Sequence, residues 1–277
     1  MANETPRRGR FRLTRTGRIA LIVCGILAVA AAVVVPLTLS GEEKRQPTTL
    51  TVPEGRRSGQ VYEAVDKALG RPAGSTKKAV PEAELKLPAE AGGNPEGYLF
   101  PATYPLDAKT TPESLLRYMV ETATKRFRAA RAAAGGGTTR NLYQTVTLAS
   151  IVQAEADNVQ DMGKVARVIH NRIARAMPLQ MDSTINYALG RSTLDTTQEE
   201  TKLDSPYNTY ARKGLPPTPI GNPGEAALKA ALSPTPGDWL YFVTVAPGDT
   251  RFTADYDEQR RNVEEFNENR GKAGQGG

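Results

Sequence analysis

The longest run of apolar positions in the chain covers residues 19–39, which include no charged side chain. At about 1.5 Å per residue, a helix of this length reaches roughly 31 Å, which is enough to cross the hydrocarbon core of a bilayer. Six arginines precede the run, and positive charge on that side favours a cytoplasmic N-terminus. The pattern therefore predicts a single-pass protein of the plasma membrane, with a basic cytoplasmic tail at 1–18 and an extracytoplasmic C-terminal region.

A cleaved signal peptide would give a similar pattern. The run is long for the apolar part of a signal peptide, and the residues after Ser40 do not form a small-x-small cleavage site. Cys24 could suggest a lipoprotein, but Val23 precedes it where a small residue is expected, and the apolar run continues well past it. We therefore favour an uncleaved anchor, followed by a short polar linker at 40–48.

The periodicities that follow the linker predict a small N-terminal region at 49–135. Its clearest helix has Thr111 as the N-cap and Pro112 at the first position, which is a common way for a helix to begin. Consecutive glycines at 135–137 end that helix and mark a boundary. The elements predicted from alternating and helical spacings are a strand at 49–52, helices at 59–69 and 112–134, an interrupted helix at 76–85 and a strand-like aromatic segment at 98–105.

A larger region at 136–270 shows further helical patterns. Asn141 and Asn222 stand where N-caps are expected, and residues 271–277 are expected to be a disordered tail. Together the two regions predict an α+β fold outside the membrane helix. The elements predicted here are helices at 142–156, 161–176 and 223–232, a strand at 239–245 and a polar helix within 253–269.

Charge and composition exclude several classes of function. The net charge is +6, but five of these charges lie before Ile19, so the basic patch is a short tail and no nucleic-acid partner is expected. Cys24 is the only cysteine and His170 the only histidine. The chain therefore lacks the residues for a Cys/His zinc site or an intramolecular disulfide, and His170 lies within a helical pattern. No metal or cofactor is expected, and any chemistry falls to carboxylates, Tyr, Ser, Thr or Lys.

The strongest candidate for chemistry is Glu155. Leu148, Ile151, Val152 and Glu155 are spaced as one face of a helix. Burial against apolar neighbours would raise the pKa of the glutamate and keep a proton available for a leaving oxygen. A glutamate on a solvent-facing part of the helix is the alternative.

Glycoside hydrolysis normally uses two carboxylates, and Asp182 is the second candidate. Its alternative role is an Asx-turn or helix cap before residues 185–189. A reaction in which the sugar's own 6-hydroxyl attacks the anomeric carbon needs only one carboxylate, which acts first as an acid and then as a base.

Two proline-stiffened loops rich in Tyr, Asn, Gln and Thr follow the glutamate. Such side chains hold sugars through hydrogen bonds and ring contacts, so we expect them to line one cleft with Glu155. Residues 215–220 could instead be a polyproline ligand for another protein, but their place inside the folded region favours a rigid wall of the cleft. The candidate binding residues are Gln180, Asp182, Ser183, Thr184, Tyr187, Tyr207, Asn208, Tyr210 and Pro217.

A series of short sequences occurs in a characteristic order and spacing between residues 49 and 263. In this respect the chain resembles the endolytic murein transglycosylase family, the YceG-like membrane proteins that cut nascent peptidoglycan glycan strands. The matching sequences are Glu-Gly-Tyr-Leu-Phe-Pro at 96–101, Leu-Ala-Ser-Ile-Val-Gln-Ala-Glu at 148–155, Val-Ala-Arg-Val-Ile-His-Asn-Arg at 165–172, Met-Pro-Leu-Gln-Met-Asp-Ser-Thr at 177–184, Ser-Pro-Tyr-Asn-Thr-Tyr at 205–210, Gly-Leu-Pro-Pro-Thr-Pro-Ile at 214–220 and Leu-Tyr-Phe-Val at 240–243.

The resemblance implies non-hydrolytic cleavage between N-acetylmuramic acid and N-acetylglucosamine, which leaves a 1,6-anhydromuramoyl end. The family's catalytic glutamate falls on Glu155, while Gln153 stands at the first acidic position of the family motif. Thr250 and Gln259 stand where many members have histidines, so roles that need imidazole are absent. The region at 49–135 resembles an abridged form of the family's small LysM-like domain, and 136–270 then corresponds to the catalytic domain.

The implied partners are peptidoglycan glycan strands and wall-synthesis proteins such as penicillin-binding proteins, with the membrane contacted through one helix. Two alternatives stay open. The missing histidines and the shortened N-terminal region suggest a catalytically silent, glycan-binding scaffold. A hydrolytic muramidase would use Asp182 as its second carboxylate.

Overall fold

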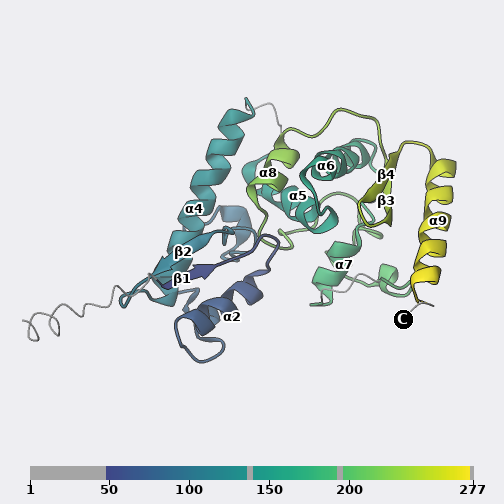
Figure 1. Ribbon diagram of the computed structural model, residues 1–277. Helices are drawn as coiled ribbons and strands as arrows, with labels where there is room; N and C mark the ends of the chain where they lie inside the picture. The colour runs from purple at the N-terminus through teal and green to yellow at the C-terminus, as the bar shows by residue number, and fades with distance from the viewer. Residues whose placement is uncertain (1–47, 136–139, 192–195, 275–277) are drawn as a thin grey trace, which may run out of the picture. The chain divides into compact units, whose positions relative to one another are not determined.

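The computed structural model of the protein describes residues 48–135, 140–191 and 196–274 (Figure 1). The predicted cytoplasmic tail and the apolar run at 19–39 lie outside the described residues. No helix within the described ranges is both long and apolar enough to cross a membrane.

The N-terminal part pairs two short strands that are distant in the sequence. β1 (Thr48–Thr51) lies beside β2 (Thr103–Leu106), where the sequence predicts strands at 49–52 and 98–105. The second strand starts later than predicted because Tyr98 lies in a turn, where its amide donates to the Pro95 carbonyl at 2.9 Å.

The helix predicted after Thr111 forms as expected. The Thr111 hydroxyl accepts a hydrogen bond from the Ser114 amide at 3.2 Å, and the Ser114 hydroxyl accepts one from the Thr111 amide at 3.0 Å. This reciprocal pair satisfies two amides that the helix itself cannot. The helices of this part are α2 (Ser58–Ala68), α3 (Ser75–Ala79), the 3-10 turn η1 (Ala89–Ala91) and α4 (Pro112–Ala133).

α5 (Leu142–Glu155) is enclosed by other elements for most of its length. It packs against α6 (Val159–Ala174), α7 (Asp182–Ala188) and α8 (Glu225–Leu232), as Figure 1 shows for α5, α6 and α8. Asn141 caps α5 as predicted, because its side-chain oxygen accepts from the Gln144 amide at 2.8 Å. The surrounding helices therefore fix the C-terminal end of α5, where Glu155 lies.

The sequence predicts Asn222 as the cap of α8, but the structure gives it another role. The helix begins at Glu225 with Gly224 as its N-cap, and Asn222 is fully buried. Its side-chain oxygen accepts from the Leu99 amide at 2.7 Å, and its amide group donates to the Arg56 carbonyl at 2.8 Å. Asn222 thus joins three distant segments of the chain, a role that satisfies more buried backbone groups than a cap would.

The C-terminal part is a hairpin covered by a helix. β3 (Tyr241–Ala246) pairs antiparallel with β4 (Asp249–Thr253), with a bulge between Thr244 and Ala246. β4 is absent from the predicted elements. α9 (Tyr256–Gly274) packs on both strands and extends into the tail predicted to be disordered.

One hydrophobic core runs through both predicted regions. Tyr98 of the N-terminal part stacks on Tyr143 of α5 with ring centroids 6.3 Å apart, and it meets Phe127 of α4 edge-on at 5.6 Å. The chain from Thr49 onward forms one compact unit. The N-terminal part is therefore packed where it can influence the elements around Glu155.

Candidate active site

Glu155 is the last residue of α5, and its side chain is half-buried. The apolar residues of the same face, Leu148, Ile151 and Val152, are completely buried. One carboxylate oxygen accepts a hydrogen bond from the Ser183 amide at 3.4 Å. Burial raises the pKa of Glu155, the nearby charge of Asp182 adds to this, and hydrogen bonding from Ser183 opposes it. The glutamate therefore has the environment of a proton donor.

Asp182 is the first residue of α7, next to the amide that contacts Glu155. Its carboxylate accepts a hydrogen bond from the Tyr210 hydroxyl at 2.5 Å. Burial, and then the hydrogen bond to Asp182, raise the pKa of Tyr210. The N-cap of α7 is Met181, so Asp182 does not have the alternative role of helix cap. The structure brings Glu155, Ser183, Asp182 and Tyr210 together.

The loop before α7 is held by Arg172 of α6, a residue that the sequence analysis did not single out. Its guanidinium donates to the carbonyl oxygen of Leu179 at 2.8 Å, to that of Leu240 at 2.6 Å and to the side-chain oxygen of Gln180 at 3.1 Å. Gln180 is exposed and has a φ of +54°, a strained conformation for this residue type. The signal that could have revealed Arg172 is a charge at the end of an otherwise apolar helix face.

Thr184 belongs to the frame of the site. Its hydroxyl donates to the Met181 carbonyl at 2.7 Å and pairs with the Thr209 hydroxyl at 2.9 Å. The Thr209 hydroxyl also accepts from the Met181 amide at 3.0 Å. Through these bonds Thr184 connects the loop at Met181 with the loop at Thr209. It is completely buried, so its hydroxyl is not available to a ligand, whereas the sequence predicts a binding residue.

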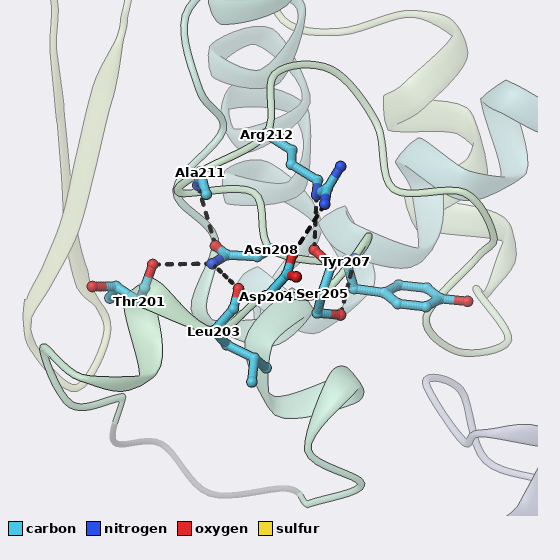
Figure 2. Close-up of polar contacts among 8 residues, drawn as sticks. All are labelled: Thr201, Leu203, Asp204, Ser205, Tyr207, Asn208, Ala211 and Arg212. Carbon is cyan, nitrogen blue, oxygen red and sulfur yellow. Dashed lines mark hydrogen bonds and ion pairs between the residues drawn. The ribbon is translucent and has the colours of Figure 1, made fainter.

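Asn208 also differs from the prediction of a cleft-lining residue. Figure 2 shows its side chain pointing into its own loop, where the amide nitrogen donates to the carbonyls of Thr201 at 3.0 Å and Leu203 at 2.7 Å. The amide oxygen accepts from the backbone of Tyr210 at 2.9 Å and of Ala211 at 3.3 Å. Asn208 is fully buried, so it shapes the loop that carries Tyr210.

Tyr187 and Tyr207 form a half-buried aromatic pair with ring centroids 5.0 Å apart. Tyr187 lies four residues after Ser183 in α7, so both project from the same face of the helix, one turn apart. The Tyr207 hydroxyl is paired with the Thr218 hydroxyl at 2.8 Å. The pair therefore extends the site from Glu155 along α7.

Pro217 lies farther away. It is exposed, and its carbonyl accepts a hydrogen bond from Tyr143 at 3.4 Å. Tyr143 and Glu155 are at opposite ends of α5, about 18 Å apart at 1.5 Å per residue. Pro217 is thus close to the start of α5 and not an immediate neighbour of the acid. Within the described part of the chain, no three His, Cys, Asp or Glu side chains form a group that could hold a metal ion.

The positions where the chain departs from the family motifs have structural contacts. The side-chain oxygen of Gln153 accepts from the Gly224 amide at 2.9 Å and so supports the start of α8. The Thr250 hydroxyl pairs with that of Thr244 at 3.0 Å across the hairpin, and the Gln259 amide donates to the Phe242 carbonyl at 3.3 Å. In this chain the last two positions stabilise the β3–β4 hairpin and its contact with α9.

The raised pKa of Glu155 predicts how the protein responds to pH. A general acid must be protonated to act, so the rate of any reaction that uses Glu155 as its acid should fall as pH rises through the raised pKa. The free energy of unfolding should also fall as pH rises. The carboxyl group ionises at its ordinary pKa in the unfolded chain, so the folded state loses stability between that pKa and the raised pKa of the folded state. The measurements are a pH–rate profile and melting curves. Activity that increases steadily through neutral pH would contradict a protonated glutamate.

The sequence matches known proteins over most of its length. The YceG-like family model matches residues 28–265. Two curated relatives are named endolytic murein transglycosylase: that of Bacillus subtilis strain 168 is 36% identical over 62% of this chain, and that of Streptococcus pneumoniae serotype 2 strain D39 is 32% identical over 81% of it. The alignments cover 48% and 46% of these relatives, so the chain spans about half their length.

The fold matches a solved structure as well. The crystal structure of a YceG-like protein from Listeria monocytogenes aligns with a TM-score of 0.67 and 28% identity, covering 78% of this chain and 75% of that one. The same family is therefore found from the order of sequence motifs, from the family model and from a solved fold. The chain belongs to the YceG-like family.

Proposed function

We propose that this protein is a lytic transglycosylase that cuts peptidoglycan glycan strands and uses Glu155 as its only general acid/base. Two observations support the proposal. Curated relatives in the family are named endolytic murein transglycosylase. The observation that carries the mechanism is the half-buried Glu155, whose pKa is raised by burial and whose carboxylate is fixed by the Ser183 amide.

In the first step, Glu155 donates its proton to the glycosidic oxygen that leaves with N-acetylglucosamine. The bond from that oxygen to C1 of N-acetylmuramic acid breaks, and Glu155 becomes a carboxylate. In the second step, the carboxylate takes the proton of the 6-hydroxyl while the 6-oxygen bonds to C1. The product has a 1,6-anhydro ring, Glu155 is protonated again and no water is consumed, so a single well-placed carboxyl group is sufficient.

Asp182 supports one rival reaction. Its charge influences Glu155 and its carboxylate is held by Tyr210, so it could activate a water molecule as the second carboxylate of a muramidase. In the lytic reaction, Asp182 would instead keep Tyr210 and the start of α7 in place.

Mass spectrometry of products from purified glycan strands tests the proposal. We expect ends that are lighter than a reducing end by one water molecule. Products that all carry reducing ends would assign the protein as a muramidase. If the protein binds glycans but forms neither product, the function is that of a catalytically silent scaffold.

We further propose that residues 19–39 anchor the protein in the plasma membrane, with the residues from 49 onward outside the cytoplasm. The charge-free apolar run and the arginines before it support this orientation. In this arrangement the region at 49–135 is an abridged LysM-like region beside the catalytic part at 136–270. Wall-synthesis proteins such as penicillin-binding proteins would then be within reach as partners.

A reporter fused after Gly277 tests this orientation. A reporter that functions only outside the cytoplasm, such as an alkaline phosphatase, should be active there, because the arginines favour a cytoplasmic N-terminus. The matched control is a reporter that functions only in the cytoplasm, fused at the same residue, which should be silent. Activity of the cytoplasmic reporter would overturn both the topology and a role in the cell wall.

A further inference from the structure

Glu96 is a deeply buried carboxylate that the proposed reaction does not use. Only 4% of its surface is exposed. One of its oxygens accepts from the Ser58 amide at 2.9 Å, and the other accepts from the Tyr187 hydroxyl at 3.1 Å. Asn222 approaches the first oxygen with its amide nitrogen at 3.5 Å. Glu96 therefore binds the N-terminal part of the chain on one side and α7 on the other.

The contact with Ser58 places Glu96 at the start of α2, where backbone amides lack partners within the helix. Arg57, which precedes Ser58, approaches Tyr187 from the side of its ring. Its guanidinium lies 5.0 Å from the centre of the Tyr187 ring and donates to the Arg191 carbonyl at 2.7 Å. Tyr187 is thus held by its hydroxyl through Glu96 and by its ring face through Arg57.

Tyr187 is close to the proposed acid. It is one helical turn beyond Ser183, whose amide contacts Glu155. Its ring packs against the ring of Tyr207. A half-exposed aromatic pair at this position offers a flat apolar surface to the C–H face of a sugar ring next to the bond being cut. The orientation of that surface depends on what fixes the Tyr187 hydroxyl.

We propose that Glu96 is a positioning residue for glycan binding, which fixes Tyr187 to the start of α2 so that the Tyr187–Tyr207 pair keeps one orientation beside Glu155. The inference rests on the proposed function, because it assumes that glycan occupies this part of the protein. It also gives the N-terminal part a role: this part completes the glycan site through Arg57, Ser58 and Glu96.

A positioning role depends on hydrogen bonding to two groups at once, which predicts different results for two substitutions. Glu96→Gln can still accept from the Ser58 amide with its oxygen and donate to the Tyr187 hydroxyl with its nitrogen. Glu96→Ala removes both hydrogen bonds and opens space beside the tyrosine. The amide variant should therefore preserve glycan binding, and the alanine variant should weaken it.

Asp66 offers a matched control. It is 3% exposed and belongs to the same part of the chain. Its carboxylate accepts from the amides of Thr76 at 2.8 Å and Gly74 at 2.7 Å, so its partners lie in the α2–α3 connection and not in α7. Asp66→Ala removes a buried carboxylate of the same region, with a similar loss of stability, but leaves Tyr187 in place.

The experiment measures glycan affinity in the catalytically inactive Glu155→Gln background, and kcat and KM in the active one, on the full chain at a temperature where every variant is folded. Glu96→Ala should weaken the affinity and raise KM about tenfold, as expected for lost buried hydrogen bonds, with kcat nearly unchanged. Glu96→Gln should stay within about threefold of the parent. Asp66→Ala should lower the melting temperature and leave affinity unchanged.

A second pair of variants tests the route through the tyrosine. Tyr187→Phe keeps the ring but removes the hydroxyl that Glu96 holds, so it should weaken glycan affinity with little change in melting temperature. In that background, Glu96→Ala should add less than about twofold, because the contact is already lost. If Glu96→Ala fails to fold, the glycan affinity of Tyr187→Phe compared with that of the parent still tests the inference.

Three results would overturn the inference while the proposed function stands: Glu96→Ala no weaker in glycan binding than Asp66→Ala, Glu96→Gln as weak as Glu96→Ala, or fully additive effects of Glu96→Ala and Tyr187→Phe. If Glu96→Ala does not fold, unchanged affinity of Tyr187→Phe overturns it. A parent protein that neither binds nor cleaves glycan strands would instead overturn the proposed function itself, and the inference with it.

Discussion

Replacing Glu155 by glutamine should reduce the rate of glycan cleavage by at least roughly 10²–10⁴-fold, the usual contribution of general acid–base catalysis. The upper end is expected because one group serves both half-reactions, so the variant can neither protonate the leaving oxygen nor accept the proton of the 6-hydroxyl. Glutamine keeps the shape of the side chain and can still accept from the Ser183 amide. The measurement is single-turnover cleavage of purified glycan strands, with melting curves recorded alongside.

The melting temperature of Glu155→Gln should be unchanged or higher, because burial disfavours the ionised glutamate. Asp157→Asn is the matched control: it makes the same chemical change two residues beyond, at an exposed position, and should leave the rate within about twofold. Asp182→Asn should reduce the rate less than Glu155→Gln if the 6-hydroxyl is the nucleophile. A Glu155→Gln variant that retains most of the activity would eliminate the proposed mechanism.

Asn208→Ala should destabilise the protein by about 2–4 kcal/mol, the second large effect that we expect. The substitution removes the partner of two carbonyl oxygens and two amides in a largely half-buried loop, and Figure 2 draws the contacts with Thr201, Leu203 and Ala211. Polar groups left unpaired within the protein are among the most damaging changes. For a protein of this size, the melting temperature should fall by roughly 5–15 °C. Thermal unfolding followed by circular dichroism provides the measurement.

Arg212→Ala is the control for this loop. Its guanidinium donates to the Ser205 carbonyl at 3.1 Å and pairs with Asp204 at 3.2 Å, but both charged side chains are largely exposed. Such a surface pair contributes at most about 1 kcal/mol, so the melting temperature should fall by only a few degrees. Equal stability of Asn208→Ala and the parent would return Asn208 to the group of candidate sugar-binding residues.

The elements that the sequence predicts well are those with local causes. The starts of α4 and α5 follow from Thr111 and Asn141, because a cap needs only the three residues that come after it. The half-buried position of Glu155 follows from helical spacing with Leu148 and Ile151 for the same reason. The sequence does not predict β4, because Phe252 is the only large apolar residue among the five positions of this strand. The pairing of β4 with β3 depends on residues outside β4.

The site residues also divide into those whose role follows from local sequence and those whose role depends on distant parts of the chain. Ser183 contacts Glu155, and Asp182 and Tyr210 lie beside it. Asn208, together with Asn222 and Thr184, has a different role from the one predicted. An asparagine or threonine side chain suits a cap, a turn or a ligand equally well, and nothing within its own segment selects among them. The role of each of these side chains is decided by the group elsewhere in the chain with which it forms a hydrogen bond.

The sequence by itself determined the family, the candidate acid and the apolar run at 19–39, because ordered motifs and periodicity are properties of the linear chain. Only the tertiary structure decided which polar side chains hold the loops together, such as those of Thr184 and Asn208. It alone brought Glu96 of the N-terminal part to Tyr187 of α7, across a sequence separation of 91 residues. Contacts of this kind depend on how distant segments pack, since each buried hydrogen-bonding group must find a partner wherever the fold supplies one.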